Sequence, residues 1–261
     1  MNAQTVLGFV KIASPDDEWT RKFTPDQIPS DCKADIFTFW QLYPDVIPHY
    51  NYRLWWDNIA ILEISTYDDW WRKIKKETRN MVRKSQKCGV EVREIHAGDS
   101  KFADGVFKIH RESPVRRGRF FKAYNTPYEW FKRVYENIPP NDILLGAYLH
   151  DEVVGVLRAV IGETFGDIQT ILGLMKHFDK AIMNALISGA VSVCSKRGIR
   201  YLAYMRMGDD DLSAFKRHNG FEKKLVPRYY VPLTILGKIV LKLGLHRFRF
   251  SFRGIREVIS V

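Results

Sequence analysis

The apolar runs after residue 142 limit the possible folds more than any other feature of this chain. Residues 143–149 and 153–161 are two such runs, and the polar turn His150-Asp151-Glu152 separates them. A third run covers 165–172. Runs of this length bounded by turn residues are typical of strands. The sequence therefore predicts three consecutive strands, the first two of them joined as a hairpin.

A long helix is expected next, over residues 178–197. Small and apolar residues recur there at helical spacing, and Gly198 ends the pattern. The expected order is strand, strand, strand, long helix, strand, short helix, strand. This order packs a helix on a mixed sheet. The last three elements of this order are expected at 200–204, 212–219 and 221–232.

The chain before residue 143 divides into a region that is hard to interpret and a region of regular elements. Residues 1–55 contain five prolines and little periodicity, so they are expected to form a few short elements. We expect domains at 1–140 and 141–233 and a basic amphipathic tail at 234–261. Strands are expected at 57–65 and 90–95, and helices at 66–86, 99–112 and 127–137.

Composition indicates a folded protein with anionic partners. Hydrophobic residues make up 46% of the 261 residues, which excludes a disordered chain. The three cysteines form no CxxC pair and no signal peptide opens the chain, so we expect a reducing, cytoplasmic location. The net charge of +11 favours nucleic acid, an acidic membrane surface or phosphorylated ligands.

Two local sequences resemble a known superfamily. Ala214-Phe-Lys-Arg-His-Asn-Gly-Phe221 is similar to the end of a GNAT domain, where a short helix runs into "GF" and a final strand. Arg79-Asn-Met-Val-Arg-Lys-Ser-Gln-Lys-Cys-Gly-Val-Glu-Val-Arg93 resembles the arginine-rich helix, glycine and strand of the Fem-type transferases. The resemblance covers roughly 57–233. It implies an α/β (α+β) fold with a GNAT-like mixed sheet flanked by helices, built as two such halves in tandem.

The resemblance also implies an activity, which is transfer of an acyl or aminoacyl group to an amine. The donor would be aminoacyl-tRNA or an acyl thioester such as acyl-CoA, and the acceptor a phosphorylated envelope precursor, a lipid or a small metabolite. Fem-type enzymes resemble this chain in having Phe-Lys before "GF", so Lys216 is the expected catalytic residue. Its ammonium would hold an anion or donate a proton. A solvated lysine on a short helix is the alternative.

The sequence departs from ordinary acetyl-CoA GNATs at the loop after the third strand. Those enzymes carry Q/R-x-x-G-x-G/A there, and its amides grip a pyrophosphate. Here the stretch is Leu172-Gly-Leu-Met-Lys-His-Phe-Asp179, in which only Gly173 remains and Asp179 adds negative charge. Acetyl-CoA in the standard pose is therefore not expected. Gly173 and Lys176 stay candidates for contact with another anionic substrate.

Basic residues supply the other candidates for substrate binding. The helix at 66–86 carries many cations, which could bind an RNA backbone or lipid headgroups or could simply be solvated. The loop at 111–122 interleaves arginines with aromatic residues, a pattern that suits phosphorylated ligands but also occurs in surface loops. From these two segments the sequence selects Arg79, Arg83, Arg116, Arg117 and Arg119.

Several classes of functional site are not expected from the sequence. The histidines have no metal spacing, and there is no GxSxG or P-loop motif.

The end of the chain is a candidate membrane-binding segment. Residues 234–250 combine a short apolar stripe with Lys238 and Lys242, which suits an anionic membrane surface or packing on the core. A catalytically inactive GNAT-like module that binds nucleic acid or membrane stays open. The candidate general bases are Glu163, Asp167, Asp209, Asp210 and Asp211.

Overall fold

A computed structural model describes residues 1–16, 20–96, 98–116 and 118–247. The chain forms two compact units. The central unit is Ala60–Glu222, and the terminal unit is Met1–Ile59 with the described chain from Lys223 onward. These units divide the chain at positions other than the expected ones, after residues 140 and 233. The pair of similar halves therefore stays a prediction.

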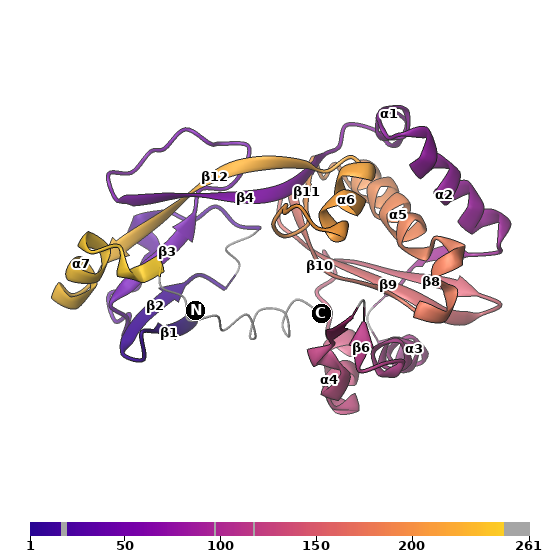
Figure 1. The fold of residues 1–261 in the computed structure, drawn as a ribbon, viewed down its shortest axis with the longest axis horizontal. Helices are drawn as coiled ribbons and strands as arrows, with labels where there is room; N and C mark the ends of the chain where they lie inside the picture. The colour runs from indigo at the N-terminus through magenta and orange to yellow at the C-terminus, as the bar shows by residue number, and fades with distance from the viewer. Residues whose placement is uncertain (17–19, 97, 117, 248–261) are drawn as a thin grey trace. The chain divides into compact units, whose positions relative to one another are not determined.

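The central unit is built on a mixed sheet flanked by helices, as the sequence predicted (Figure 1). Its strand order is β4-β11-β10-β9-β8-β5. Strands β10 and β11 pair in parallel, and the other neighbours pair antiparallel. The strands are β4 (Arg53–Glu63, in this unit from Ala60), β5 (Glu91–Glu94), β8 (Ile143–Leu149), β9 (Glu152–Ile161), β10 (Phe165–Gly173) and β11 (Tyr201–Ala203).

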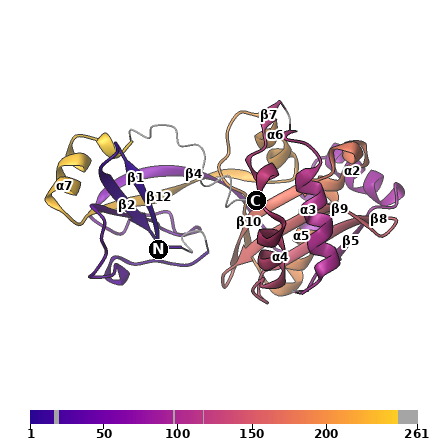
Figure 2. The same cartoon turned by 90° about the horizontal axis from the view of Figure 1, so that it is seen from below.

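Helices cover both faces of this sheet. A Cβ built on Gly155 of β9 would meet Ile182 and Leu186 of α5, whereas one built on Gly146 of β8 would meet Phe102 of α3. Gly155 shares its face with Ala147, and successive strand residues point to opposite faces, so α3 and α5 lie on opposite sides. Helix α4 packs beside α3 (Figure 2), and α1 and α2 pack on α5. The helices are α1 (Tyr67–Lys73), α2 (Lys76–Lys87), α3 (Ser100–Arg111), α4 (Tyr128–Glu136), α5 (Ile182–Arg197) and α6 (Asp211–His218).

Short elements connect these helices and strands. The two-stranded β6–β7 hairpin follows α3, and a 3-10 helix, η3, joins β10 to α5. Gly198 is the left-handed C-cap of α5, with φ of 72°, as the sequence predicted. The short elements are β6 (Val115–Arg116), β7 (Arg119–Phe120), η1 (Pro25–Gln27), η2 (Lys122–Asn125), η3 (Met175–Lys180) and η4 (Leu245–Arg247).

The predicted single helix at 66–86 is two helices, α1 and α2. Ile74 and Lys75 have extended backbone, with ψ of 152° and 155°, and they separate the two. The Arg79 side chain donates from Nη1 to the carbonyl oxygens of Trp71, Arg72 and Ile74, at 3.1, 3.3 and 2.6 Å. These carbonyls are at the end of α1, where helical partners are missing. The break therefore depends on an arginine cap, which apolar spacing alone does not predict.

In the sheet, the strands of the terminal unit follow the order β1-β2-β3-β12-β4, and β4 continues into the central unit. Its first three strands fall in the region where the sequence indicated only short elements. Helix α7 packs on this sheet through Val240 and Leu241. Gly237 allows the close approach, because a Cβ there would lie 2.0 Å from the Asp35 carbonyl oxygen. The elements are β1 (Asn2–Val6), β2 (Val10–Ser14), β3 (Ile36–Trp40), β12 (Glu222–Pro232) and α7 (Ile235–Lys242).

A buried ion pair joins the strands of the terminal unit. Arg228 Nε of β12 donates to Asp57 Oδ2 of β4 at 2.6 Å, and Trp40 Nε1 of β3 donates to the same oxygen at 2.8 Å. The Arg228 guanidinium also lies 4.0 Å from the centroid of the Trp40 ring. Asp57 and Arg228 are 3% and 6% exposed, so neither charge can exchange its partner for water.

We expect Asp57→Ala to lower the free energy of unfolding by about 3–5 kcal/mol, because it leaves the Arg228 charge buried without its carboxylate. Urea denaturation followed by circular dichroism measures this change. Asp31→Ala is the control. Asp31 is exposed, and its removal should change the free energy of unfolding by no more than about 0.5 kcal/mol. Equal effects of the two substitutions would contradict the role given to the pair.

Candidate functional site

The candidate site is built around Lys216 on helix α6. Asp210 is the N-cap of this helix and accepts hydrogen bonds from the Ser213 amide at 3.0 Å and from Ser213 Oγ at 2.7 Å. Asp210, one of the candidate general bases, therefore caps this helix. The Lys216 side chain turns inward and is 1% exposed. Its Nζ donates to the Arg206 carbonyl oxygen at 2.7 Å and lies 4.4 Å from the centroid of the Tyr204 ring.

Burial changes the acid–base behaviour of Lys216. Loss of water around the ammonium lowers the pKa of Lys216 from 10.5 to about 8, although the charges of Asp210 and Asp167 oppose this change. Asp167 lies on β10, is 3% exposed and accepts a hydrogen bond from Gln169. A lysine with such a pKa holds and releases a proton near neutral pH, whereas a solvated lysine does not.

The C-terminal end of α6 is fixed by polar contacts with other helices of the central unit. Trp70 Nε1 of α1 donates to the Asn219 carbonyl oxygen at 2.9 Å, and Thr78 Oγ1 of α2 donates to the His218 carbonyl oxygen at 2.8 Å. Asn184 Nδ2 of α5 donates to Asn219 Oδ1 at 3.3 Å. These contacts hold Lys216 in place. No sequence pattern indicated them, because the partners are 35 to 149 residues apart.

Arg79 and Arg83 make their contacts on α1 and α2. Arg79 caps α1, as described above, and this role occupies its Nη1. Arg83 is exposed and lies 5.3 Å from the centroid of the Trp71 ring, and its Nη1 donates to Asn80 Oδ1 at 3.4 Å. The cations of this segment that stay exposed are Arg72, Lys73, Lys75, Lys76, Arg83, Lys84 and Lys87.

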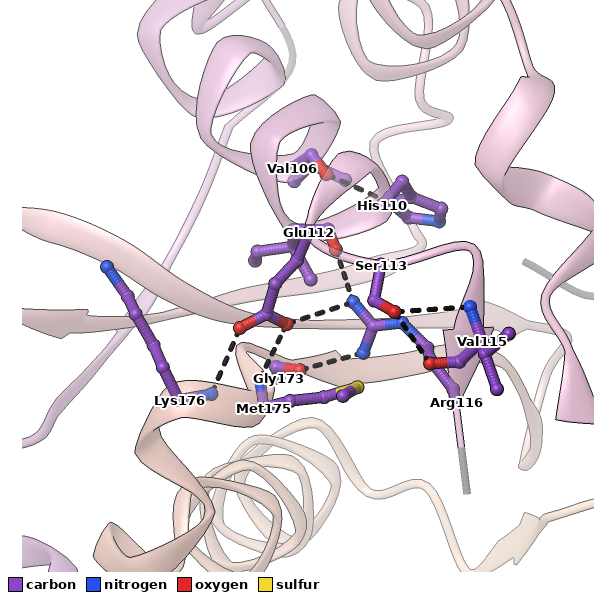
Figure 3. A network of polar contacts seen from close by, with 10 residues as sticks. Val106, His110, Glu112, Ser113, Val115, Arg116, Gly173, Met175 and Lys176 are labelled. Atoms are coloured by element: carbon purple, nitrogen blue, oxygen red, sulfur yellow. Dashed lines mark hydrogen bonds and ion pairs between the residues drawn. The ribbon is translucent and has the colours of Figure 1, made fainter. Parts of the chain in front are cut away.

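Arg116, Gly173 and Lys176 come together in one polar network with Glu112 (Figure 3). Arg116 Nη1 donates to the Gly173 carbonyl oxygen at 3.0 Å, and Arg116 Nη2 donates to the Ile109 carbonyl oxygen. Glu112 accepts from the backbone amides of Met175 and Lys176 at 2.6 and 3.0 Å. The sequence selected three residues of this network but missed Glu112, whose partners lie 63 and 64 positions further along the chain.

The other two arginines of the basic loop are not part of this network among the described contacts. Arg119 is exposed on β7, where it pairs with Arg116 across the hairpin. Arg117 lies outside the described residues. Both therefore remain predicted substrate contacts.

Two cavities of the central unit lie away from Lys216. One, of about 250 Å³, is lined by Tyr67, Ser85 and Ser188 among others, between α1, α2 and α5. The other, of about 290 Å³, lies at the β8–β9 hairpin beside Arg93 and Tyr148. Lys216 lines neither of these two. Because its side chain is 1% exposed, a substrate would reach the ammonium only after the side chains around it move. Among the residues that the structure describes, no group of three or more His, Cys, Asp or Glu side chains is placed to hold a metal ion.

Comparisons with known proteins support the fold. No protein-family model matches the sequence, and no curated protein matches it either. Among solved structures, L-PGS from Bacillus licheniformis is similar over 87% of this chain and 73% of its own, with 12% identity and a TM-score of 0.54. FemX is similar over 71% of this chain and 63% of its own, with 11% identity and a TM-score of 0.55.

A third similar structure is the C-terminal domain of an Agrobacterium fabrum protein assigned as a lysylphosphatidylglycerol synthetase. It matches 84% of this chain and 75% of its own, with 10% identity and a TM-score of 0.54. The chain therefore has a GNAT-like fold, which confirms the predicted mixed sheet flanked by helices. Likeness at such low identity shows the fold alone, so function has to be argued from the site.

The pKa of Lys216 predicts how stability changes with pH. Below pH 8 the ammonium is charged in the folded and the unfolded protein, and the full penalty of burial applies. Between pH 8 and 10.5 the folded protein has released this proton while the unfolded chain still holds it, so the free energy of unfolding rises with pH.

We therefore expect the stability of wild type relative to Lys216→Met to increase by about 2 kcal/mol between pH 7.5 and pH 10. Urea denaturation of both proteins at the two pH values measures this difference. The same comparison with Lys132→Met, which replaces an exposed lysine of α4, should give no such change. A wild-type advantage that does not vary with pH would show that Lys216 has an ordinary pKa.

Proposed function

We propose that the chain is a Fem-like N-acyltransferase that moves an acyl or aminoacyl group from an activated carrier to an amine. The observation that carries this proposal is the buried ammonium of Lys216, with its pKa lowered to about 8. Among the described residues, one hydrogen bond to a carbonyl oxygen engages this ammonium, which has three N–H donors. The other donors are available to a substrate oxygen.

The reaction follows from this arrangement. The acceptor amine attacks the carbonyl carbon of the donor, a C–N bond forms, and negative charge develops on the carbonyl oxygen. A preorganised cation in a water-poor site stabilises that charge strongly. The C–O or C–S bond to the carrier then breaks, and the carrier leaves with a proton equivalent to the one that the amine loses. Lys216 can stabilise the oxyanion or supply the proton to the leaving group.

The carrier and the acceptor are proposed to be anionic. The seven exposed cations at 72–87 form a basic surface on the central unit, which suits the phosphates of an RNA carrier or of a phosphorylated acceptor. The name of one similar structure supports an anionic acceptor, since that protein is assigned to the synthesis of an aminoacylated phospholipid. An acyl ester on tRNA and an acyl thioester are both retained as donors.

A structural role competes with catalysis at Lys216. The hydrogen bond from Nζ to the Arg206 carbonyl oxygen also fixes the segment between β11 and α6. In a binding module without chemistry, this tether would be the whole function of the residue. The two roles differ in what they change, because a tether affects stability, whereas a catalytic ammonium affects the rate in a protein that is still folded.

We expect Lys216→Met to lower the rate of acyl transfer by about a hundred- to a thousandfold, the loss typical of removing one oxyanion donor. The measurement follows transfer of a radiolabelled acyl group from aminoacyl-tRNA or acyl-CoA to a panel of amines, including hydroxylamine. Lys132→Met is the matched control and should keep the wild-type rate. A folded Lys216→Met protein with wild-type transfer would assign the lysine to the tether alone.

We further propose that the terminal unit docks on an anionic membrane through α7. Ile235, Ile239 and Leu243 are 77%, 50% and 63% exposed, and Lys238 and Lys242 are exposed on the same segment. Aliphatic side chains beside lysines suit the interface of an anionic bilayer. None of the helices in the described ranges is long and apolar enough to cross a membrane. Residues 248–250 of the predicted membrane segment lie outside those ranges.

Ile239→Asp should lower binding to vesicles of phosphatidylcholine and phosphatidylglycerol by about tenfold or more, because it removes buried apolar area and adds a repelled charge. Sedimentation with the vesicles measures this binding. Leu225→Asp is the control, since Leu225 is 51% exposed on β12 of the same unit and should not contribute. Equal loss in both variants, or a wild-type protein that dimerises and ignores vesicles, would rule out α7 as the membrane contact.

A further inference from the structure

The turn between β10 and α5 holds an internal anion. Both carboxylate oxygens of Glu112 accept hydrogen bonds there, Oε2 from the Met175 amide at 2.6 Å and Oε1 from the Lys176 amide at 3.0 Å (Figure 3). Two adjacent backbone amides that converge on one anion are the arrangement by which protein turns bind phosphate. In this chain a carboxylate from the end of α3 uses both donors.

Arg116 holds this carboxylate in place. Its Nη2 lies 3.4 Å from Glu112 Oε2, while Nη1 donates to the Gly173 carbonyl oxygen at the end of β10. The face of the guanidinium is covered by Phe121, whose ring centroid is 4.9 Å away. The side chains of Glu112 and Arg116 are only 16% and 12% exposed. The pair therefore exchanges little with water, and displacing Glu112 would leave Arg116 without its counter-charge.

Neither His110 nor Lys176, the nearby titratable side chains, takes part in the contact between Glu112 and the two amides. His110 is buried and neutral, since loss of water lowers its pKa to about 4. The Lys176 ammonium points to Glu152 Oε1, at 3.5 Å, and not to Glu112. Glu112 is thus the one carboxylate that the described contacts place on the amides of Met175 and Lys176.

We propose that Glu112 determines donor specificity by occupying the position that a donor phosphate would take, which keeps phosphate-bearing thioesters such as acetyl-coenzyme A out of the β10–α5 turn. Each backbone amide has one hydrogen, and both are used, so an incoming phosphate finds no donor there and meets a negative charge. This inference rests on the proposed acyl transfer, because it concerns the donor of that reaction. It requires the phosphates of the true donor to bind elsewhere.

The test is calorimetric binding of inorganic pyrophosphate and of acetyl-CoA, with no acceptor present. Glu112→Ala frees both amides and removes the carboxylate beside the Arg116 guanidinium. Glu112→Gln keeps the size of the side chain and removes its charge, so it serves if the alanine variant does not fold. Glu152→Ala is the matched control, because it removes a nearby carboxylate that contacts the Lys176 side chain and leaves the amides bound to Glu112.

Pyrophosphate should bind Glu112→Ala at least about tenfold more tightly than wild type, which corresponds to 1.4 kcal/mol. Glu112→Gln should show a smaller gain, and Glu152→Ala should match wild type. The proposal is overturned if wild type binds either ligand as tightly as the Glu112 variants do, or if Glu152→Ala gains as much. Because binding is measured without turnover, a gain in the Glu112 variants would stand even if no acyl transfer were found.

Discussion

The chemistry that we propose for this protein depends on the burial of one ammonium group. Lys216 is almost fully removed from water, and the energetic cost of this burial appears as a pKa near 8. The charge is tolerated because Asp210 and Asp167 stabilise it and the Arg206 carbonyl oxygen accepts a hydrogen bond from it. Helix α6 is in turn held by contacts from α1, α2 and α5. A small displacement of that helix would expose the ammonium to water and return the pKa of Lys216 toward the value of a solvated lysine.

The second electrostatic feature of the central unit is an internal anion in the turn after β10. The turn that follows β10 has amides oriented for an anion, but Glu112 and Arg116 close it with groups of the chain itself. Because the pair is mostly buried and braced by backbone carbonyls, it belongs to the folded structure and is not a surface contact that salt would screen. In the proposed function, exposed cations such as those of α2 recognise the anionic carrier.

The sequence predicted the elements whose side chains repeat at regular spacing, and it failed where long-range contacts decide. β8, β9 and β10 carry long apolar runs and α5 carries apolar residues at helical spacing, and they were predicted close to their observed bounds, except that α5 begins at Ile182 and not at 178. β3 is only five residues long and lies among the prolines of the first 55 residues, so it was not recognised. Arg79 lies in a segment whose many cations are typical of a solvated helix face. Its role as a cap depends on the break before α2. Lys216 was selected through resemblance, but its burial depends on residues distant in sequence.

The most direct test of this account is a crystal structure of the chain with a stable amide analogue of an aminoacyl-adenosine, in which the ester of the donor cannot react. We expect the analogue's carbonyl oxygen to lie within hydrogen-bond distance of Lys216 Nζ, while Glu112 stays on the amides of Met175 and Lys176. An analogue bound with its carbonyl away from Lys216, or a Glu112 carboxylate displaced from those amides by the analogue, would contradict this prediction.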